Sequence, residues 1–207
     1  MADLQKYLDM LRDIYAVSAE LGIKSFIWGG FAVDILYGKP TREHSDLDCF
    51  TENLVENIGV LESRYESLGY TIRYSEDFWM LRILKDGVET TFNTVRNVDG
   101  IAHWHHAGPH GTVFFPFEWL DGKPSSFCSV PAYTCGVRLA YALKTNPRLL
   151  RAEWETRPKD QADIEVLEEI IASRGIDKED IKRKVWGHTP YWYAKGYPEY
   201  YYPIILT

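Results

Sequence analysis

The spacing of hydrophobic residues near the N-terminus predicts a helix, a buried strand, a second helix and a second strand, in that order. Across residues 2–21, apolar side chains recur every three to four positions, as on one face of a helix. Residues 26–28, Phe-Ile-Trp, form a short apolar run that predicts a buried strand. Residues 31–37 again have helical spacing and predict a short helix, which Gly38 is expected to end. From Ser45 onward acidic and apolar residues alternate, so a second strand is expected there.

The segment that follows predicts one helix and three strands. Asn53 is expected to cap the helix, and Gly69 is expected to end it. Asp86-Gly87 is a hairpin turn sequence between two of the strands. The predicted strands are residues 70–74, 78–85 and 88–95. This order of elements predicts an α+β fold, in which a mixed sheet carries helices on one face and is followed by C-terminal helices.

Glycine and proline are frequent in the middle of the chain, and helical periods return towards its end. Residues 97–129 are expected to be loop-rich, with short strands near 112–115 and 127–130. Helices are predicted at residues 131–143, from Pro158 onward, and at 177–185.

Composition and charge restrict the class of protein. The chain is 45% hydrophobic and 26% charged, as in ordinary globular proteins. Its net charge of −7 argues against a nucleic-acid partner and is compatible with a cationic small substrate. The 3 cysteines lack the spacing of a metal site and are expected to be reduced thiols. Without an apolar run of membrane-spanning length or a signal-peptide pattern, the sequence predicts a cytoplasmic protein with no membrane partner.

Two carboxylates and two glycines form the strongest candidate for chemistry. Asp46 and Asp48 flank Leu47 on the second predicted strand, so strand alternation places both carboxylates on one face. Such a pair repels itself unless a cation neutralises it, and oxygen ligands favour magnesium over zinc. Gly29-Gly30 lies at the preceding strand-to-helix turn, where unpaired backbone amides can bind phosphate. Alone, each feature is equally explained as a tight turn or an exposed strand edge; together they indicate a nucleoside triphosphate bound with Mg²⁺.

This stretch resembles the signature of the small nucleotidyltransferases of the DNA polymerase beta superfamily, and is most similar to their lincosamide and aminoglycoside 2''-nucleotidyltransferase branch. The residues that carry the resemblance are Gly29-Gly30, Asp34, Gly38, Thr41-Arg42-Glu43-His44 and Asp46-Leu47-Asp48. It implies a polymerase-beta-like fold over residues 1–129, with a helical C-terminal region and aromatic tail over 130–207, although both could form one compact unit. It also implies metal-dependent transfer of a nucleoside monophosphate, from a triphosphate such as ATP, to a hydroxyl of a lincosamide or aminoglycoside.

The third carboxylate of this family is displaced or absent. In the resembling enzymes an acid lies on the strand after the hairpin, and the best alignment places Thr91 there. Glu89 lies two residues earlier, points to the same face, and is a candidate catalytic base. The alternative is an exposed hairpin glutamate. In that case the protein would be an impaired nucleotide-binding or toxin–antitoxin-type member of the same superfamily.

Two basic residues are further candidates for nucleotide binding. Arg42 could contact a phosphate or brace its loop, whereas His44 is expected to pack at the strand entry. Lys159, in a Lys-Asp-x-x-Asp stretch that resembles the family's C-terminal helix motif, would reach the triphosphate. The alternative is a helical ion pair between Lys159 and Asp163.

Two aromatic or histidine-rich segments have less specific signals. Four histidines lie between His103 and His110, and a substrate-lining loop is favoured there over a zinc site. The tyrosine-rich tail, residues 187–207, is expected to pack on the domain as a strap, with base stacking or a homodimer interface as alternatives.

Overall fold

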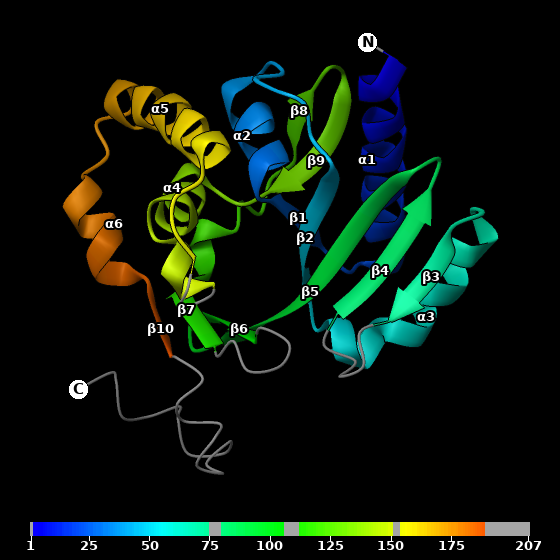
Figure 1. Cartoon of the computed structure of the whole chain (residues 1–207). Helices are drawn as coiled ribbons and strands as arrows, with labels where there is room; N and C mark the ends of the chain where they lie inside the picture. Colours follow the sequence, from blue (N-terminus) through cyan, green and yellow to red (C-terminus); the bar gives the residue numbers. More distant parts are fainter. Residues whose placement is uncertain (1, 75–79, 106–111, 151–153, 189–207) are drawn as a thin grey trace.

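A computed structural model describes residues 2–74, 80–105, 112–150 and 154–188 (Figure 1). The helices are α1 (Ala2–Leu21), α2 (Gly30–Tyr37), α3 (Leu54–Ser67), α4 (Val137–Thr145), α5 (Pro158–Ser173) and α6 (Lys178–Lys184), with short 3-10 turns η1 (Phe117–Trp119) and η2 (Pro147–Leu149). The strands are β1 (Ser25–Trp28), β2 (Asp46–Glu52), β3 (Thr71–Tyr74), β4 (Met80–Lys85), β5 (Val88–Val98), β6 (Ile101–His105), β7 (Thr112–Pro116), β8 (Ser125–Phe127), β9 (Val130–Thr134) and β10 (Trp186–His188).

The strands form one mixed sheet, which confirms the predicted fold class. Its order is β10-β7-β6-β5-β2-β1-β9-β8. The pairs β2–β5 and β1–β9 are parallel, and the remaining pairs are antiparallel. The long strand β5 pairs with β4 along its first part and with β6 along its last part, both on the side away from β2. Strands β1, β2 and β5 therefore lie side by side at the centre, and their side chains can form one site.

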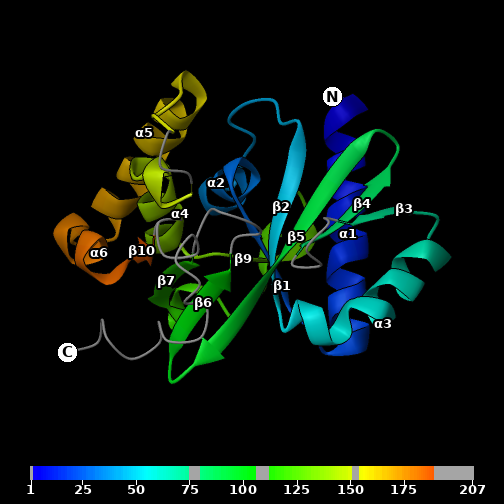
Figure 2. The same ribbon diagram turned by 60° about the horizontal axis from the view of Figure 1, so that its bottom comes forward.

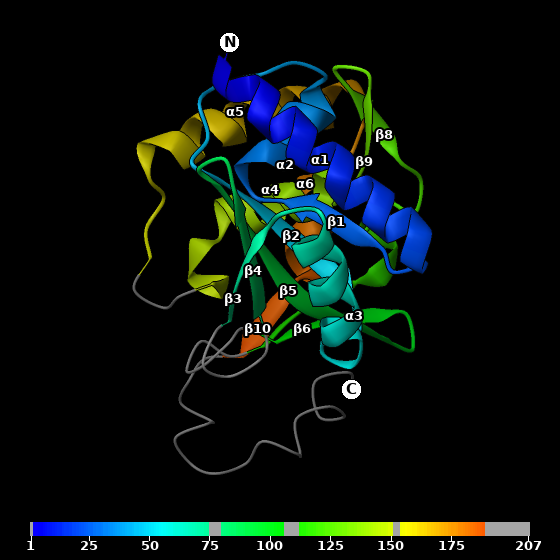
Figure 3. The same ribbon diagram turned by 90° about the vertical axis from the view of Figure 1, so that its right-hand side faces the viewer.

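Helices α1 and α3 cover one face of the sheet. Leu47 and Cys49 of β2 point to this face and are buried, and the Thr90 hydroxyl donates there to the Met10 sulfur on α1. Figure 3 shows α1 and α3 in front of the strands, whereas α4, α5 and α6 lie on the opposite side of the molecule (Figures 1 and 2). The side chains of β2 that alternate with Leu47 and Cys49 face away from α1 and α3.

Turn residues place the central elements as predicted. Gly38 ends α2 with φ of 86°, and its amide donates to the Asp34 carbonyl. Asp86-Gly87 joins β4 and β5 with φ of 53° and 81°, the left-handed conformation that a tight hairpin needs.

The predicted side-chain cap of α3 is wrong. Asn53 is left-handed with φ of 49°, makes no capping hydrogen bond, and instead its backbone amide donates to Val95.

The prediction for residues 97–143 needs two corrections. Residues 97–129 are mainly strand among the described residues, because β6 and β7 extend the sheet from β5. Residues 131–134, predicted as helix, belong to strand β9, and α4 begins only at Val137. Residues 26 and 27 of β1 pair in parallel with residues 133 and 134 of β9. This long-range pairing outweighs the local helical pattern of the segment.

The hydrophobic core contains residues from both sides of position 129, where the sequence predicts a division of the chain into two regions. One cluster of buried side chains includes residues of α1, β2 and β5 together with those of α4 and α5. Within the described residues, none of the helices is both long and apolar enough to span a membrane. The predicted strap of the tail lies outside the described residues from position 189 onward.

A glycine substitution in the turn between β8 and β9 is expected to stabilise the protein. Phe127 pairs with Val130, so Cys128 and Ser129 form a two-residue turn, with φ of 47° and 65°. The left-handed conformation costs a non-glycine residue about 1 kcal/mol of folding free energy. The larger unfolded-state entropy of glycine offsets part of the gain from substitution. Ser129→Gly should raise the free energy of unfolding by about 0.5–1 kcal/mol in urea titrations. The control Ser126→Gly, at the exposed position of strand β8, should lower the free energy of unfolding; equal effects of both substitutions would contradict the argument.

Candidate active site

Asp46 and Asp48 lie on the face of β2 that α1 and α3 leave uncovered. Asp46 is exposed and Asp48 is partly buried, whereas Leu47 between them is buried on the opposite face. Asp48 lies directly across from Trp28 on β1 and from Thr91 on β5. The two carboxylates therefore share one face, as strand alternation predicts.

The environment of Asp48 opposes its ionisation. Burial raises the pKa of Asp48 to about 7, and the neighbouring charge of Asp46 adds to the effect. The positive charges of Lys144, Arg82 and Lys159 oppose the rise. A cation that binds beside this carboxyl would lower its pKa and displace its proton to solvent.

The glycine pair packs directly against the carboxylates and the loop that precedes them. Gly29 has φ of 75°, and a Cβ there would lie 3.1 Å from the Asp48 Oδ2 atom. Gly30 opens α2, and a Cβ on it would lie 1.8 Å from Nη2 of Arg42 and 3.2 Å from Nδ1 of His44. No side chain caps this end of α2. The absence of side chains at Gly29 and Gly30 thus lets the turn approach both Asp48 and Arg42.

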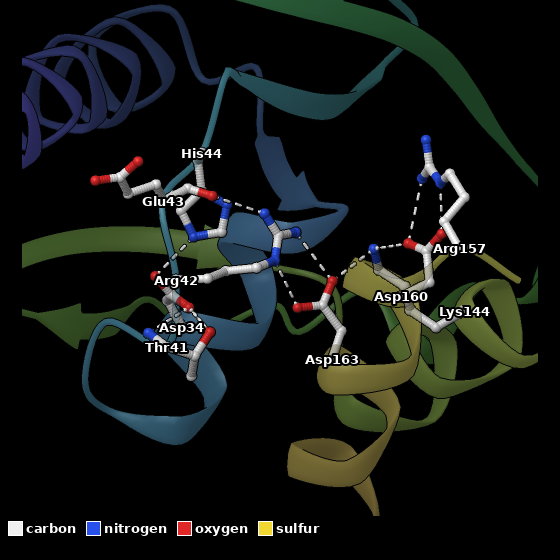
Figure 4. Close-up of polar contacts among 9 residues, drawn as sticks. All are labelled: Asp34, Thr41, Arg42, Glu43, His44, Lys144, Arg157, Asp160 and Asp163. Carbon is white, nitrogen blue, oxygen red and sulfur yellow. Dashed lines mark hydrogen bonds and ion pairs between the residues drawn. The ribbon is translucent and has the colours of Figure 1, made fainter.

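A buried carboxylate on α2 holds the loop between α2 and β2. Asp34 Oδ1 accepts hydrogen bonds from the backbone amide (3.0 Å) and the hydroxyl (2.5 Å) of Thr41. Its Oδ2 lies 2.8 Å from Nε2 of His44, and both side chains are at most 5% exposed (Figure 4). The His44 ring packs edge-on against Phe31, and its carbonyl accepts from the Tyr7 hydroxyl. His44 is a packing residue at the strand entry, as expected.

A chain of ion pairs around the buried carboxylates of Asp160 and Asp163 joins this loop to α4 and α5 (Figure 4). Nε and Nη2 of Arg42 donate to the two oxygens of Asp163, at 2.9 and 3.0 Å. Lys144 on α4 lies 2.7 Å from both Asp163 and Asp160, and Arg157 contacts Asp160 at 2.6 Å. Although burial alone would raise it, hydrogen bonds from Arg42 and Lys144 hold the pKa of Asp163 below its usual value.

The helical ion pair considered for Lys159 is not formed. Asp163 pairs with Arg42 and Lys144 instead, and Lys159 is exposed at the start of α5 without an ion pair among the described residues. Its charge still acts on Asp48. The sequence did not indicate Lys144 or Arg157 as partners, because only the fold brings them to Asp160; the one available signal was the Lys-Asp-x-x-Asp stretch itself.

Glu89 lies beside the carboxylate pair. The parallel register places Glu89 across from Asp46, and Thr91 across from Asp48, on the same face. The side chain of Glu89 is 33% exposed and lies 3.9 Å from the Arg73 guanidinium on β3. Arg82, across from Thr91 on β4, is an exposed cation on this face.

Metal-ligand geometry is limited to two carboxylates. Among the described residues, no three His, Cys, Asp or Glu side chains come close enough together to hold one ion, so Glu89 does not complete a three-acid group. Asp46 and Asp48 supply only oxygen donors, and burial together with the charge of Asp46 raises the pKa of Asp48, a cost that a bound cation would offset, so both fit Mg²⁺. His103 and His105 belong to β6, and His103 is buried against Phe114 instead of lining a loop; residues 106–110 lie outside the described residues.

The chain is similar to known nucleotidyltransferases in sequence and in fold. The model of the family described as aminoglycoside-2''-adenylyltransferase matches residues 10–100. The lincosamide antibiotic adenylyltransferase LnuA, lincomycin-bound, is 19% identical with a TM-score of 0.57, covering 76% of this chain and 93% of LnuA. ANT(2'')-Ia in complex with adenylyl-2''-tobramycin is 16% identical with a TM-score of 0.62, covering 86% of this chain and 95% of that chain. Its solution structure is 18% identical with a TM-score of 0.58, covering 86% and 90%.

None of the curated proteins matches the chain. The family match over residues 10–100 includes β1, α2, β2 and β5, the elements that carry Gly29, Gly30, Asp46, Asp48 and Glu89. The solved structures extend the likeness of fold to 76% and 86% of the chain. The chain therefore has the fold of these nucleotidyltransferases, and its residues 10–100 match the aminoglycoside-2''-adenylyltransferase family model.

Proposed function

We propose that the protein transfers a nucleoside monophosphate, from ATP, to a hydroxyl group of a small molecule. The observation that carries the proposal is the packing of the Gly29 backbone against Asp48, where a Cβ would lie 3.1 Å from the carboxylate oxygen. A phosphate-binding turn and a metal-binding carboxylate pair must be neighbours if one nucleotide is to contact both. Gly29 and Asp48, to which we assign these two roles, are neighbours in this fold, and this supports the proposal.

Each residue of the site has a distinct role in the proposal. Asp46 and Asp48 would hold Mg²⁺, and the bound ion would supply charge neutralisation for the phosphates and polarise the phosphorus that is attacked. The amides of Gly29 and Gly30 bind the triphosphate, and Lys159 contributes a cation towards the leaving pyrophosphate. Glu89 accepts the proton of the attacking hydroxyl. The attack forms a bond from the hydroxyl oxygen to the α-phosphorus and breaks the bond to pyrophosphate.

The acceptor that we propose is an antibiotic of the lincosamide or aminoglycoside class. This proposal rests on the likeness to LnuA, which is lincomycin-bound, and to ANT(2'')-Ia, which is in complex with adenylyl-2''-tobramycin. The formal charge of −7 supports attraction of a cationic acceptor. The positive charges of Arg82 and Arg73 would repel a polycationic aminoglycoside near Glu89. A lincosamide has fewer amino groups than an aminoglycoside and therefore fits the surroundings of Glu89 better.

The test is transfer to a panel of acceptors. The protein is incubated with each nucleoside triphosphate, Mg²⁺, and lincosamides or aminoglycosides, and the products are identified by mass spectrometry. We expect an adduct that carries one nucleoside monophosphate, with ATP as the best donor. Nucleotide binding without an adduct on any acceptor would contradict the proposal.

That outcome would favour a second function, a nucleotide-binding member without turnover. The specific observation behind it is Thr91, which lies across from Asp48; the resemblance to the nucleotidyltransferase signature implies an acid at this position. Calorimetry that detects Mg²⁺-dependent ATP binding, together with the absence of products, would identify this case.

A further inference from the structure

The guanidinium of Arg42 rests on the glycine turn. A Cβ on Gly30 would lie 1.8 Å from Nη2 and 2.8 Å from Cζ of Arg42, so the guanidinium occupies the space of the missing side chain. On its other side, the turn contacts Asp48 through Gly29. The backbone that we propose to bind triphosphate is thus held between Arg42 and the carboxylate pair.

The hydrogen-bonding edge of Arg42 is already occupied. Nε and Nη2 form a bidentate pair with Asp163, and Nη1 donates to the Glu43 carbonyl at 2.9 Å. The Asp163 side chain is 1% exposed and the Arg42 side chain 21% exposed. A phosphate that took the bidentate edge would leave a buried carboxylate with Lys144 as its remaining cation, which is costly.

We propose that Arg42 is a positioning residue that fixes the Gly29-Gly30 turn to α5 through Asp163, and that it does not bind phosphate. The proposal rests on the proposed function only in that the turn receives the triphosphate. Arg42 links the turn to Asp163 on α5, and Lys144 links Asp163 to α4 (Figure 4). Loss of either member of the Arg42–Asp163 pair therefore releases the turn in the same way.

A double-mutant cycle separates positioning from phosphate binding. Calorimetric titration with Mg²⁺–ATP is made on Arg42→Gln, Asp163→Asn and the double variant. We expect each single variant to bind about tenfold more weakly, and the double variant to bind no more weakly than the weaker single variant. If Asp163→Asn bound ATP as tightly as the wild type while Arg42→Gln did not, Arg42 would be a phosphate ligand and the proposal would be wrong.

The conservative variant Arg42→Lys gives a second distinction. Lysine keeps the positive charge but lacks the planar fork that engages both oxygens of Asp163. We expect Arg42→Lys to resemble Arg42→Gln in ATP affinity. Recovery of wild-type affinity with lysine would indicate a charge that acts on phosphate, against the proposal.

A third arm needs no nucleotide and so is independent of the proposed function. Gly30→Ala introduces a Cβ into the position of the guanidinium and should displace Arg42 from Asp163. We expect Gly30→Ala to lower the thermal midpoint in the wild type, and to lower it by less than half as much in the Arg42→Gln background. Additive effects would show that Arg42 does not hold the turn. Absence of ATP binding by the wild type, with this coupling present, would contradict only the proposed function.

Discussion

Replacement of Asp48 by asparagine is expected to abolish nucleotidyl transfer and to make the protein more stable at pH 8. Activity is lost because the amide cannot balance the charge of a metal ion. Stability is gained because burial raises the pKa of Asp48 from 3.8 to about 7, so that the ionised carboxylate is unfavourable in the folded state. The gain above pH 7 should be about 2–4 kcal/mol.

The sign of the pH dependence follows from proton binding. Between about pH 4 and pH 7 the folded wild type holds the Asp48 proton and the unfolded chain has released it. The contribution of Asp48 to stability is therefore lost as the pH rises through this window. The amide introduced by Asp48→Asn does not titrate, so the stability difference between variant and wild type should be small at pH 4 and largest above pH 7.

Urea titrations across this pH range, with and without Mg²⁺, measure the effect. Asp99→Asn is a matched control, since Asp99 is an exposed turn residue with φ of 52° that asparagine also tolerates. Mg²⁺ should stabilise the wild type and the control but not Asp48→Asn. Turnover by Asp48→Asn at limiting Mg²⁺, or unchanged stability at pH 8, would refute the assignment.

The central part of the fold was predictable because its signals are local. Gly38 ends α2, Asp86-Gly87 forms the hairpin, and alternation around Leu47 assigns both aspartates to one face. The Asp99-Gly100 turn between β5 and β6 has the same dipeptide and the same left-handed conformation, with φ of 52° and 84°. Strand β6 could therefore have been found from sequence, had the many glycines and prolines around it not favoured a loop.

Other features depend on partners that are distant in sequence. Strand β9 forms where β1 offers a parallel edge, and no periodicity of the segment itself indicates that pairing. The bond of Arg42 to Asp163 joins residues 121 positions apart. Sequence could identify both residues as candidates, but their pairing requires the packing of α5 beside α2. This packing is the basis on which we propose that Arg42 is a brace and not a phosphate ligand.

Glu89→Gln is expected to reduce turnover roughly a hundredfold while Mg²⁺–ATP binding is retained. Glu89 lies across from Asp46 on the adjacent strand, with its side chain on the carboxylate face and one-third exposed. It does not form a three-acid group with Asp46 and Asp48. Its proposed role is therefore to accept the hydroxyl proton, and glutamine, which has nearly the same shape, removes that ability alone.

Arg73→Gln is the matched control for this prediction, because Glu89 also forms an ion pair with Arg73 at 3.9 Å. An exposed pair of this length contributes less than about 1 kcal/mol to stability, so neither substitution should change folding appreciably. Single-turnover rates with saturating ATP should fall for Glu89→Gln and stay near the wild-type value for Arg73→Gln. Equal losses would mean that Glu89 acts through the ion pair. An unaffected rate in Glu89→Gln would mean that no residue of β5 serves as the base, since Thr91, across from Asp48, has no carboxylate with which to accept the proton.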